Sequence, residues 1–229
     1  MTTVVDELID QRVAELSVRL NGSRRATADI LREVRHGLTD AAQGYEADGM
    51  PPEEAARAAI AEFGEPTELA REFQVELVSR QTRLALGFVA ASGPVSEVLS
   101  RIQWSNSSYT PDSSPPEYTY LLALFVDVQG WGLSLFAVGM LLVMGFGVRR
   151  FAFRVRIAQL VAVGILSKVI VVSVAGVALM YLYRMPVVAD GVFGFVLGLL
   201  YPLTTVYLAW LAWRCARTAT WANRLTSAA

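Results

Sequence analysis

"VGILSKVIVVSVAG", residues 163–176, is a run of apolar side chains with a single charge inside it, and this run decides the class of fold. The charge belongs to Lys168, the only lysine in the chain. The apolar run extends over roughly 157–183, which is longer than the about 20 residues that a helix needs to cross a bilayer core. Hydrophobic residues make up 54% of the chain and charged residues only 18%. This composition favours a membrane protein over an ordinary soluble domain.

Three other segments are candidates for crossing a membrane. Residues 119–147 and 192–213 are long and apolar enough. Residues 84–104 are a weaker candidate, because a proline, a glutamate and an arginine interrupt the apolar run. The alternative for this segment is an interfacial or re-entrant helix.

The arginines favour four spans. If residues 84–104 cross, the connections on the side of the N-terminus carry nine arginines: Arg80, Arg83, Arg149, Arg150, Arg154, Arg156, Arg214, Arg217 and Arg224. The opposite connections carry only Arg184. Cytoplasmic connections are enriched in Lys and Arg. The asymmetry therefore predicts an even number of spans, with both termini in the cytoplasm.

The charge balance divides the chain into two parts near Arg80. Residues 1–80 hold nine arginines against sixteen acids, a net charge of −7, whereas residues 81–229 hold eleven basic residues against five acids, a net charge of +6. The start, "MTTVVDELIDQRVAEL", carries acids where a secretory signal would have basic residues. We therefore expect a cytoplasmic domain at 1–80, the head, and a transmembrane domain at 81–229.

Four amphipathic helices are predicted within the head, because apolar residues recur there at helical spacing. Ser23 after the first helix is a candidate N-cap, and Gly49 ends the second helix. Pro51 and Pro52 suit the start of the third, and Gly64 ends it. Thr67 is a candidate N-cap for the fourth, which runs on toward the membrane. The predicted fold is therefore all-α: a small four-helix cytoplasmic head followed by a four-helix transmembrane bundle.

The negative head excludes some partners and favours others. DNA and anionic lipid surfaces are themselves negative, so direct nucleic-acid binding is not expected. A basic cytosolic protein remains a candidate partner, and a merely solvated acidic surface is the alternative. No Cys/His cluster with zinc spacing and no nucleophile–base motif is present, so we expect no metal, no cofactor and no enzyme activity. The single histidine, His36, is expected on the surface or in helix packing.

The segment "EVRHGLTDAAQGYEADGMPPEEAARAAIAEFGEPTELAREF", residues 33–73, resembles the bacterial permease prefix domain 1, which is related to HAAS-type signalling domains. The positions that match the family pattern are Glu33, His36, Asp40, Gly49, Glu53, Glu54, Ala55, Ala59, Phe63, Gly64 and Pro66. The resemblance implies a head attached to a bacterial permease or small multi-span protein of the cytoplasmic membrane. It also implies association with a PadR-like winged-helix repressor. The candidate partner surface comprises Glu33, His36, Asp40, Glu53 and Glu54.

Lys168 lies close to the centre of the bilayer in this topology. At about 1.5 Å of rise per residue it is roughly 18 Å from Arg156 and about 24 Å from Arg184. An unpaired ammonium at this depth costs about 2.5 kcal/mol or more, so a partner inside the bundle is expected.

Glu97 and Asp127 are the candidate partners of Lys168. On the same ruler Glu97 lies within roughly 3 Å of Lys168 in depth, whereas Asp127 is roughly 9 Å away. Arg101 lies one helical turn beyond Glu97 and competes for it. A Lys168–Glu97 pair would fix helix register on the structural interpretation, and would serve an ion or proton relay on the functional one.

The sequence supports two function classes. The first is a non-enzymatic membrane protein of regulation or signalling, whose head binds a cytosolic partner. The alternative is a small transporter or permease-accessory subunit, in which Glu97, Asp127 and Lys168 line a polar path. A Gly-x-x-x-Gly pattern at 194–198 leaves self-association open.

Overall fold

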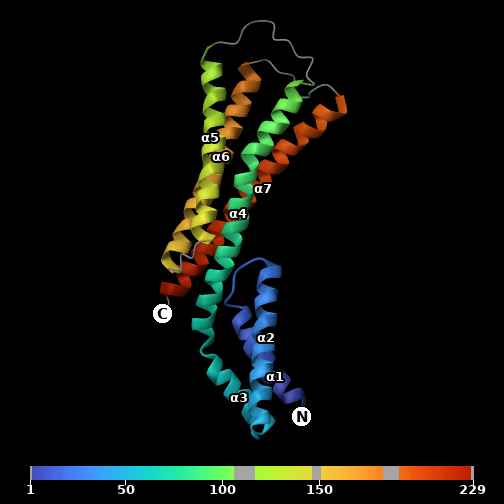
Figure 1. The fold of residues 1–229 in the computed structure, drawn as a ribbon, viewed down its shortest axis with the longest axis vertical. Coiled ribbons are helices and arrows are strands. Elements are labelled where there is room, and N and C mark those ends of the chain that lie inside the picture. Colours follow the sequence, from blue (N-terminus) through green and yellow to red (C-terminus); the bar gives the residue numbers. More distant parts are fainter. Residues whose placement is uncertain (1, 106–116, 146–150, 183–190, 228–229) are drawn as a thin grey trace. The chain divides into compact units, whose positions relative to one another are not determined.

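The computed structural model describes residues 2–105, 117–145, 151–182 and 191–227. Every element in these ranges is an α-helix, which confirms the all-α prediction (Figure 1). The helices are α1 (Thr2–Ser17), α2 (Arg24–Ala47), α3 (Pro52–Phe63), α4 (Pro66–Ser105), α5 (Glu117–Gly145), α6 (Phe151–Leu182) and α7 (Gly191–Ser227). Most of the expected outer loop, 106–116, and Arg149, Arg150 and Arg184 lie outside the described residues.

The chain forms two compact units. One comprises Met1–Gln81 together with Arg217–Ala229, and the other comprises Thr82–Ala216. Helices α4 and α7 therefore each contribute residues to both units. Residues 217–229, which are expected in the transmembrane domain, are grouped with the residues of the head.

Local signals set most helix ends in the head. The Ser23 hydroxyl accepts a hydrogen bond of 3.2 Å from the Ala26 N–H, which confirms the predicted N-cap of α2. Gly49 has a φ of +96°, directly after α2 and its C-cap. The predicted Thr67 N-cap is wrong, because α4 begins at Pro66. A proline costs little in the first helical position, where its missing N–H has no helical acceptor.

The head encloses an apolar core between α1, α2, α3 and the first turns of α4. Helices α1, α2 and α3 pack against one another. The buried residues of this core are Ile9, Leu16, Ile30, Val34, Leu38, Ala70 and Leu77. A smaller cluster joins α2 to α3 through Ala42, Ala56 and Ala59. The apolar faces that helical periodicity predicts thus point inward.

The last turns of α7 belong to this unit and close the loop between α1 and α2. The Trp221 indole N–H donates a hydrogen bond of 2.8 Å to the Arg19 carbonyl. Gln74 of α4 is fully buried and bonds both backbone groups of Asn21, with distances of 2.9 Å to its N–H and 2.8 Å to its carbonyl. Its amide also reaches the Thr218 carbonyl at 3.5 Å. One buried side chain thus ties the loop to two helices.

The second unit has a core to which all four of its helices contribute. Helices α5 and α6 run side by side (Figure 1). The buried core residues are Ala85, Leu86, Val89, Ala137, Met144, Ile157, Val161, Ala162, Ile165, Leu208, Ala212 and Cys215. Arg83 donates a hydrogen bond of 3.2 Å to the Met144 carbonyl in the last turn of α5. Carbonyls in the last turn of a helix receive no hydrogen bond from an N–H of the same helix, so Arg83 supplies the missing donor. We call this unit the bundle.

Two helices within the described residues are long and apolar enough to cross a membrane: α5, and the Val155–Ala178 part of α6. Four spans were expected, and α4 and α7 do not meet this measure in the described residues. In α4 the reason is chemical, because Pro94, Glu97 and Arg101 interrupt its apolar run. Only 11% of the apolar window of α5 and 28% of that of α6 is buried inside the protein, unlike the core helices of soluble domains.

The exteriors of the two units differ in kind. Of the large hydrophobic residues that are exposed among the described residues, only Val4 and Val18 belong to the head. The bundle has thirty-two, and α5 and α6 alone supply nineteen of them. They include Phe125, Leu135 and Val174, which are 55%, 68% and 65% exposed. The bundle therefore presents an apolar surface outward as well as an apolar core inward.

Candidate functional site

Lys168 is held by a serine of a neighbouring helix. The residue is only 8% exposed, and its Nζ donates a hydrogen bond of 2.6 Å to Ser92 Oγ of α4. The Ser92 hydroxyl in turn donates to the Val89 carbonyl of its own helix at 2.8 Å. Because the hydroxyl proton is directed to this carbonyl, Ser92 offers its oxygen to the lysine.

A second buried serine joins α5 to the same point of α4. Ser134 is 4% exposed, and its Oγ lies 3.2 Å from the Val89 carbonyl and 3.0 Å from the Gly130 carbonyl. The two helices approach closely here, because a Cβ added at Gly93 would collide with the Ser134 hydroxyl and lie 3.3 Å from the Gly130 carbonyl. Polar groups of α4, α5 and α6 thus meet around Val89 and Gly93.

The two carboxylates expected beside Lys168 are placed elsewhere. Glu97 accepts a hydrogen bond of 2.6 Å from Arg101 Nε, so the competitor recognised in the sequence is its partner. Asp127 is exposed. Within the described parts of the chain, no ion pair includes Lys168. The structure therefore does not bring Lys168, Glu97 and Asp127 together into one polar path.

Rotation around α4 explains why Ser92 was missed. Ser92 and Glu97 are five residues apart, which corresponds to about 140° around a helix. Only one of them can point at a given neighbour. The depth of a residue along the helix, which the sequence gives, carries no information on this angle. Ser92, a polar residue about one and a half turns before Glu97, was the feature of the sequence that could have indicated the contact with Lys168.

The candidate partner surface of the head is accessible. Glu33, His36, Asp40, Glu53 and Glu54 are all exposed. Glu53 pairs with Arg57 one turn later in α3 at 2.5 Å, which is a solvent-exposed pair of small energetic value. Among the residues that the structure describes, no group of three or more His, Cys, Asp or Glu could hold a metal ion.

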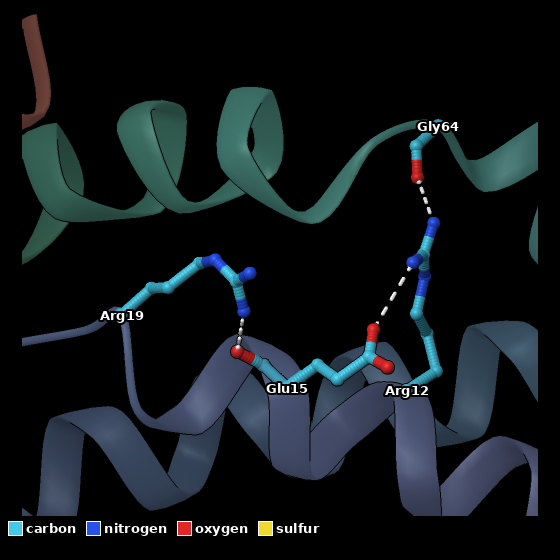
Figure 2. A network of polar contacts seen from close by, with 4 residues as sticks. All are labelled: Arg12, Glu15, Arg19 and Gly64. Atoms are coloured by element: carbon cyan, nitrogen blue, oxygen red, sulfur yellow. Dashed lines mark hydrogen bonds and ion pairs between the residues drawn. The ribbon is translucent and has the colours of Figure 1, made fainter. Parts of the chain in front are cut away.

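Arg12 of α1 contacts the turn that precedes α4, and Arg19 contacts the end of α1 itself (Figure 2). Arg12 donates a hydrogen bond of 2.6 Å to the Gly64 carbonyl and lies 3.2 Å from a carboxylate oxygen of Glu15. Arg19 donates to the Glu15 backbone carbonyl at 2.5 Å. Gly64 is the C-cap of α3, so Arg12 satisfies a carbonyl near a helix end while it complements the negative end of the helix dipole.

One tyrosine of the head is coupled to an acid across two helices. Tyr45 of α2 donates a hydrogen bond of 2.7 Å to the Glu62 carboxylate of α3. This bond and the negative charge of Glu62 raise the pKa of Tyr45 above its ordinary value. The hydrogen bond links α2 to α3 at an exposed position.

Comparison with known proteins gives no relative from which a site could be transferred. No family model, no curated protein and no solved structure matches the chain. The sites above therefore stand on their own geometry.

Proposed function

We propose that this chain is a non-enzymatic regulatory or signalling protein of the bacterial cytoplasmic membrane, with a cytosolic head that binds a protein partner. The observation that carries the proposal is the contrast between the two exteriors. The bundle presents thirty-two large hydrophobic residues outward and the head only two, within the described residues. Soluble proteins rarely expose large contiguous apolar patches. Lipid tails are the medium that would cover such a surface without cost.

The chemistry of the head supports a basic partner. The charge of residues 1–80 is −7, from nine arginines and sixteen acids, and the acids of the candidate partner surface are exposed. Complementary charge accelerates association and selects partners. The resemblance of residues 33–73 to permease prefix and HAAS-type domains makes a PadR-like winged-helix repressor the proposed partner.

Continuous helices support a signalling role. Helices α4 and α7 each carry residues of the bundle and of the head without a break in the helix. Rigid secondary elements are one means by which two sites become coupled. In this proposal, a change within the bundle reaches the loop between α1 and α2 through Gln74 and Trp221.

Salt-dependent co-purification tests the partner proposal. The tagged full chain in mild detergent is expected to retain a PadR-like repressor of the same organism at low salt, and to release it as salt screens the charges. Replacement of Glu53 and Glu54 by Gln should weaken retention, whereas Glu117→Gln outside the head should not. Absence of a complex at low salt would contradict the proposal.

A further inference from the structure

Lys168 carries a buried charge that no acid neutralises in the described parts of the chain. The residue is 8% exposed and lies in the apolar Val155–Ala178 part of α6. Glu97 is bonded to Arg101, and Asp127 is exposed. A buried ammonium is strongly disfavoured without a counter-charge. A protonated Lys168 would therefore leave the bundle with one uncompensated positive charge at this point.

The hydrogen bonds around Lys168 are incomplete as well. An ammonium group has three N–H donors, and the Lys168 Nζ makes one hydrogen bond among the described residues, to Ser92 Oγ. The Ser92 hydroxyl donates to the Val89 carbonyl, so its oxygen is available only as an acceptor for the lysine. Two N–H groups remain to be satisfied by something other than these serine contacts.

The helix α4 is continuous beside Lys168, but its hydrogen-bond ladder lacks one donor there. Ser92 is followed by Gly93 and Pro94, and Pro94 lies inside α4. Proline has no N–H, so the Ala90 carbonyl lacks the donor that residue 94 would otherwise supply. Ionisable side chains inside a membrane are rare and mark places where ions and charged substrates bind or pass.

We propose that Lys168, positioned by its hydrogen bond to Ser92, forms a binding site for a monovalent anion inside the bundle. One positive charge in apolar surroundings is balanced by one negative charge, whereas a dianion such as phosphate would reverse the imbalance. A carboxylate matches best, because its two oxygens can accept the two remaining N–H groups of the lysine. The carboxylate can come from the bilayer, as a fatty acid, or from water, as a short-chain acid. The proposal rests on the membrane placement proposed above.

Equilibrium binding to the full chain tests this site. The protein is reconstituted in phosphatidylcholine nanodiscs, and radiolabelled acetate and oleate serve as the two probes. Saturable binding of acetate, competed by unlabelled acetate, supports a site supplied from water. Saturable binding of oleate alone supports a site supplied from the bilayer. If neither acetate nor oleate binds saturably, the proposal is overturned.

Variants locate the site. Lys168→Gln is expected to weaken binding about tenfold or more, because it removes the charged donor. Arg101→Gln is the matched control, because it removes another cation of the same unit and should change affinity less than about twofold. Ser92→Ala retains the lysine, so it serves where Lys168→Gln does not reconstitute, and it should weaken binding several-fold. Binding by Lys168→Gln and by Ser92→Ala that equals the binding of the wild type overturns the assignment.

Failure of this inference and failure of the proposed function give different results. If the chain inserts into nanodiscs but binds neither probe, the anion site is excluded and the proposed membrane placement stands. If the chain is soluble without lipid or detergent, both the membrane placement and the anion site are excluded.

Discussion

At Gly64 the backbone adopts a φ of +92° and a ψ of −177°, a conformation that is essentially restricted to glycine. This residue turns the chain from α3 to α4, and its carbonyl is the acceptor of Arg12 (Figure 2). The space around it is open, since an added Cβ would meet nothing within 4 Å. The constraint on this position therefore comes from the backbone alone.

Gly64→Ala is predicted to destabilise the head by about 1–3 kcal/mol, the cost of a strained backbone conformation. Gly37→Ala is the matched control, because Gly37 lies in α2 in equally open space and has no unusual φ. It should stabilise α2 by about 0.5–1 kcal/mol through higher helix propensity. Hydrogen exchange of head peptides, measured by mass spectrometry on the full chain, reports both changes. Equal protection in the two variants would contradict this interpretation of Gly64.

At the scale of elements, the end of α7 and the buried Gln74 hold the loop between α1 and α2. Removing the Gln74 amide leaves the N–H and carbonyl of Asn21 without these partners. An unsatisfied buried group costs about 1–3 kcal/mol, and Asn21 is partly buried, so about 1 kcal/mol for each of its two groups is expected. The loop, rather than the helices, should respond first.

Gln74→Ala is therefore predicted to increase hydrogen exchange at residues 18–23 and to lower the stability of the head by about 2 kcal/mol. Gln43→Ala removes the same side chain from an exposed position of α2 and should change stability by less than about 0.5 kcal/mol. If the loop exchanges at the same rate in both variants, Gln74 does not hold it.

The close approach of α4 and α5 makes Gly93 a second element-scale test. Gly93→Ala would push a methyl group against the Ser134 hydroxyl, and overpacking of this kind costs about 1–3 kcal/mol. Gly87→Ala, on the same helix and in open space, is the control and should be neutral or stabilising. The thermal unfolding midpoint in detergent measures the difference. A Gly93→Ala midpoint at or above that of Gly87→Ala would exclude the tight contact.

The helices of the head could be predicted because their signals are local. Ser23 caps the helix that starts beside it, and Gly49 and Gly64 lie next to the ends that they mark. The prediction of Thr67 as an N-cap was wrong because Pro66, one residue earlier, already occupies the first helical position. The hydrogen bond from Trp221 to the Arg19 carbonyl joins residues 202 positions apart, and no local sequence pattern predicts such a contact.

The candidate site was predicted only in part, for a geometric reason. The depth of Lys168 and the competition of Arg101 for Glu97 follow from residue spacing. The choice of Ser92 over Glu97 depends on how α4 is rotated about its axis, which packing at Gly93 and Ser134 sets. Sequence spacing along one helix does not contain that rotation.

At the scale of the whole molecule, the two units differ in the surface that each presents outward. The head buries its apolar faces and exposes its acids, as a domain in water does. The bundle has apolar residues both inside and outside. Water around the head and hydrocarbon around the bundle would suit these two surfaces.

Extraction of cell membranes that contain the full chain tests this central claim most directly. We predict that the protein stays in the membrane pellet after washing with alkaline carbonate and enters solution only with detergent, because the apolar exterior of the bundle needs a hydrocarbon medium to cover it. Release of the chain by carbonate, as a monodisperse species without detergent, would contradict the membrane placement of the bundle.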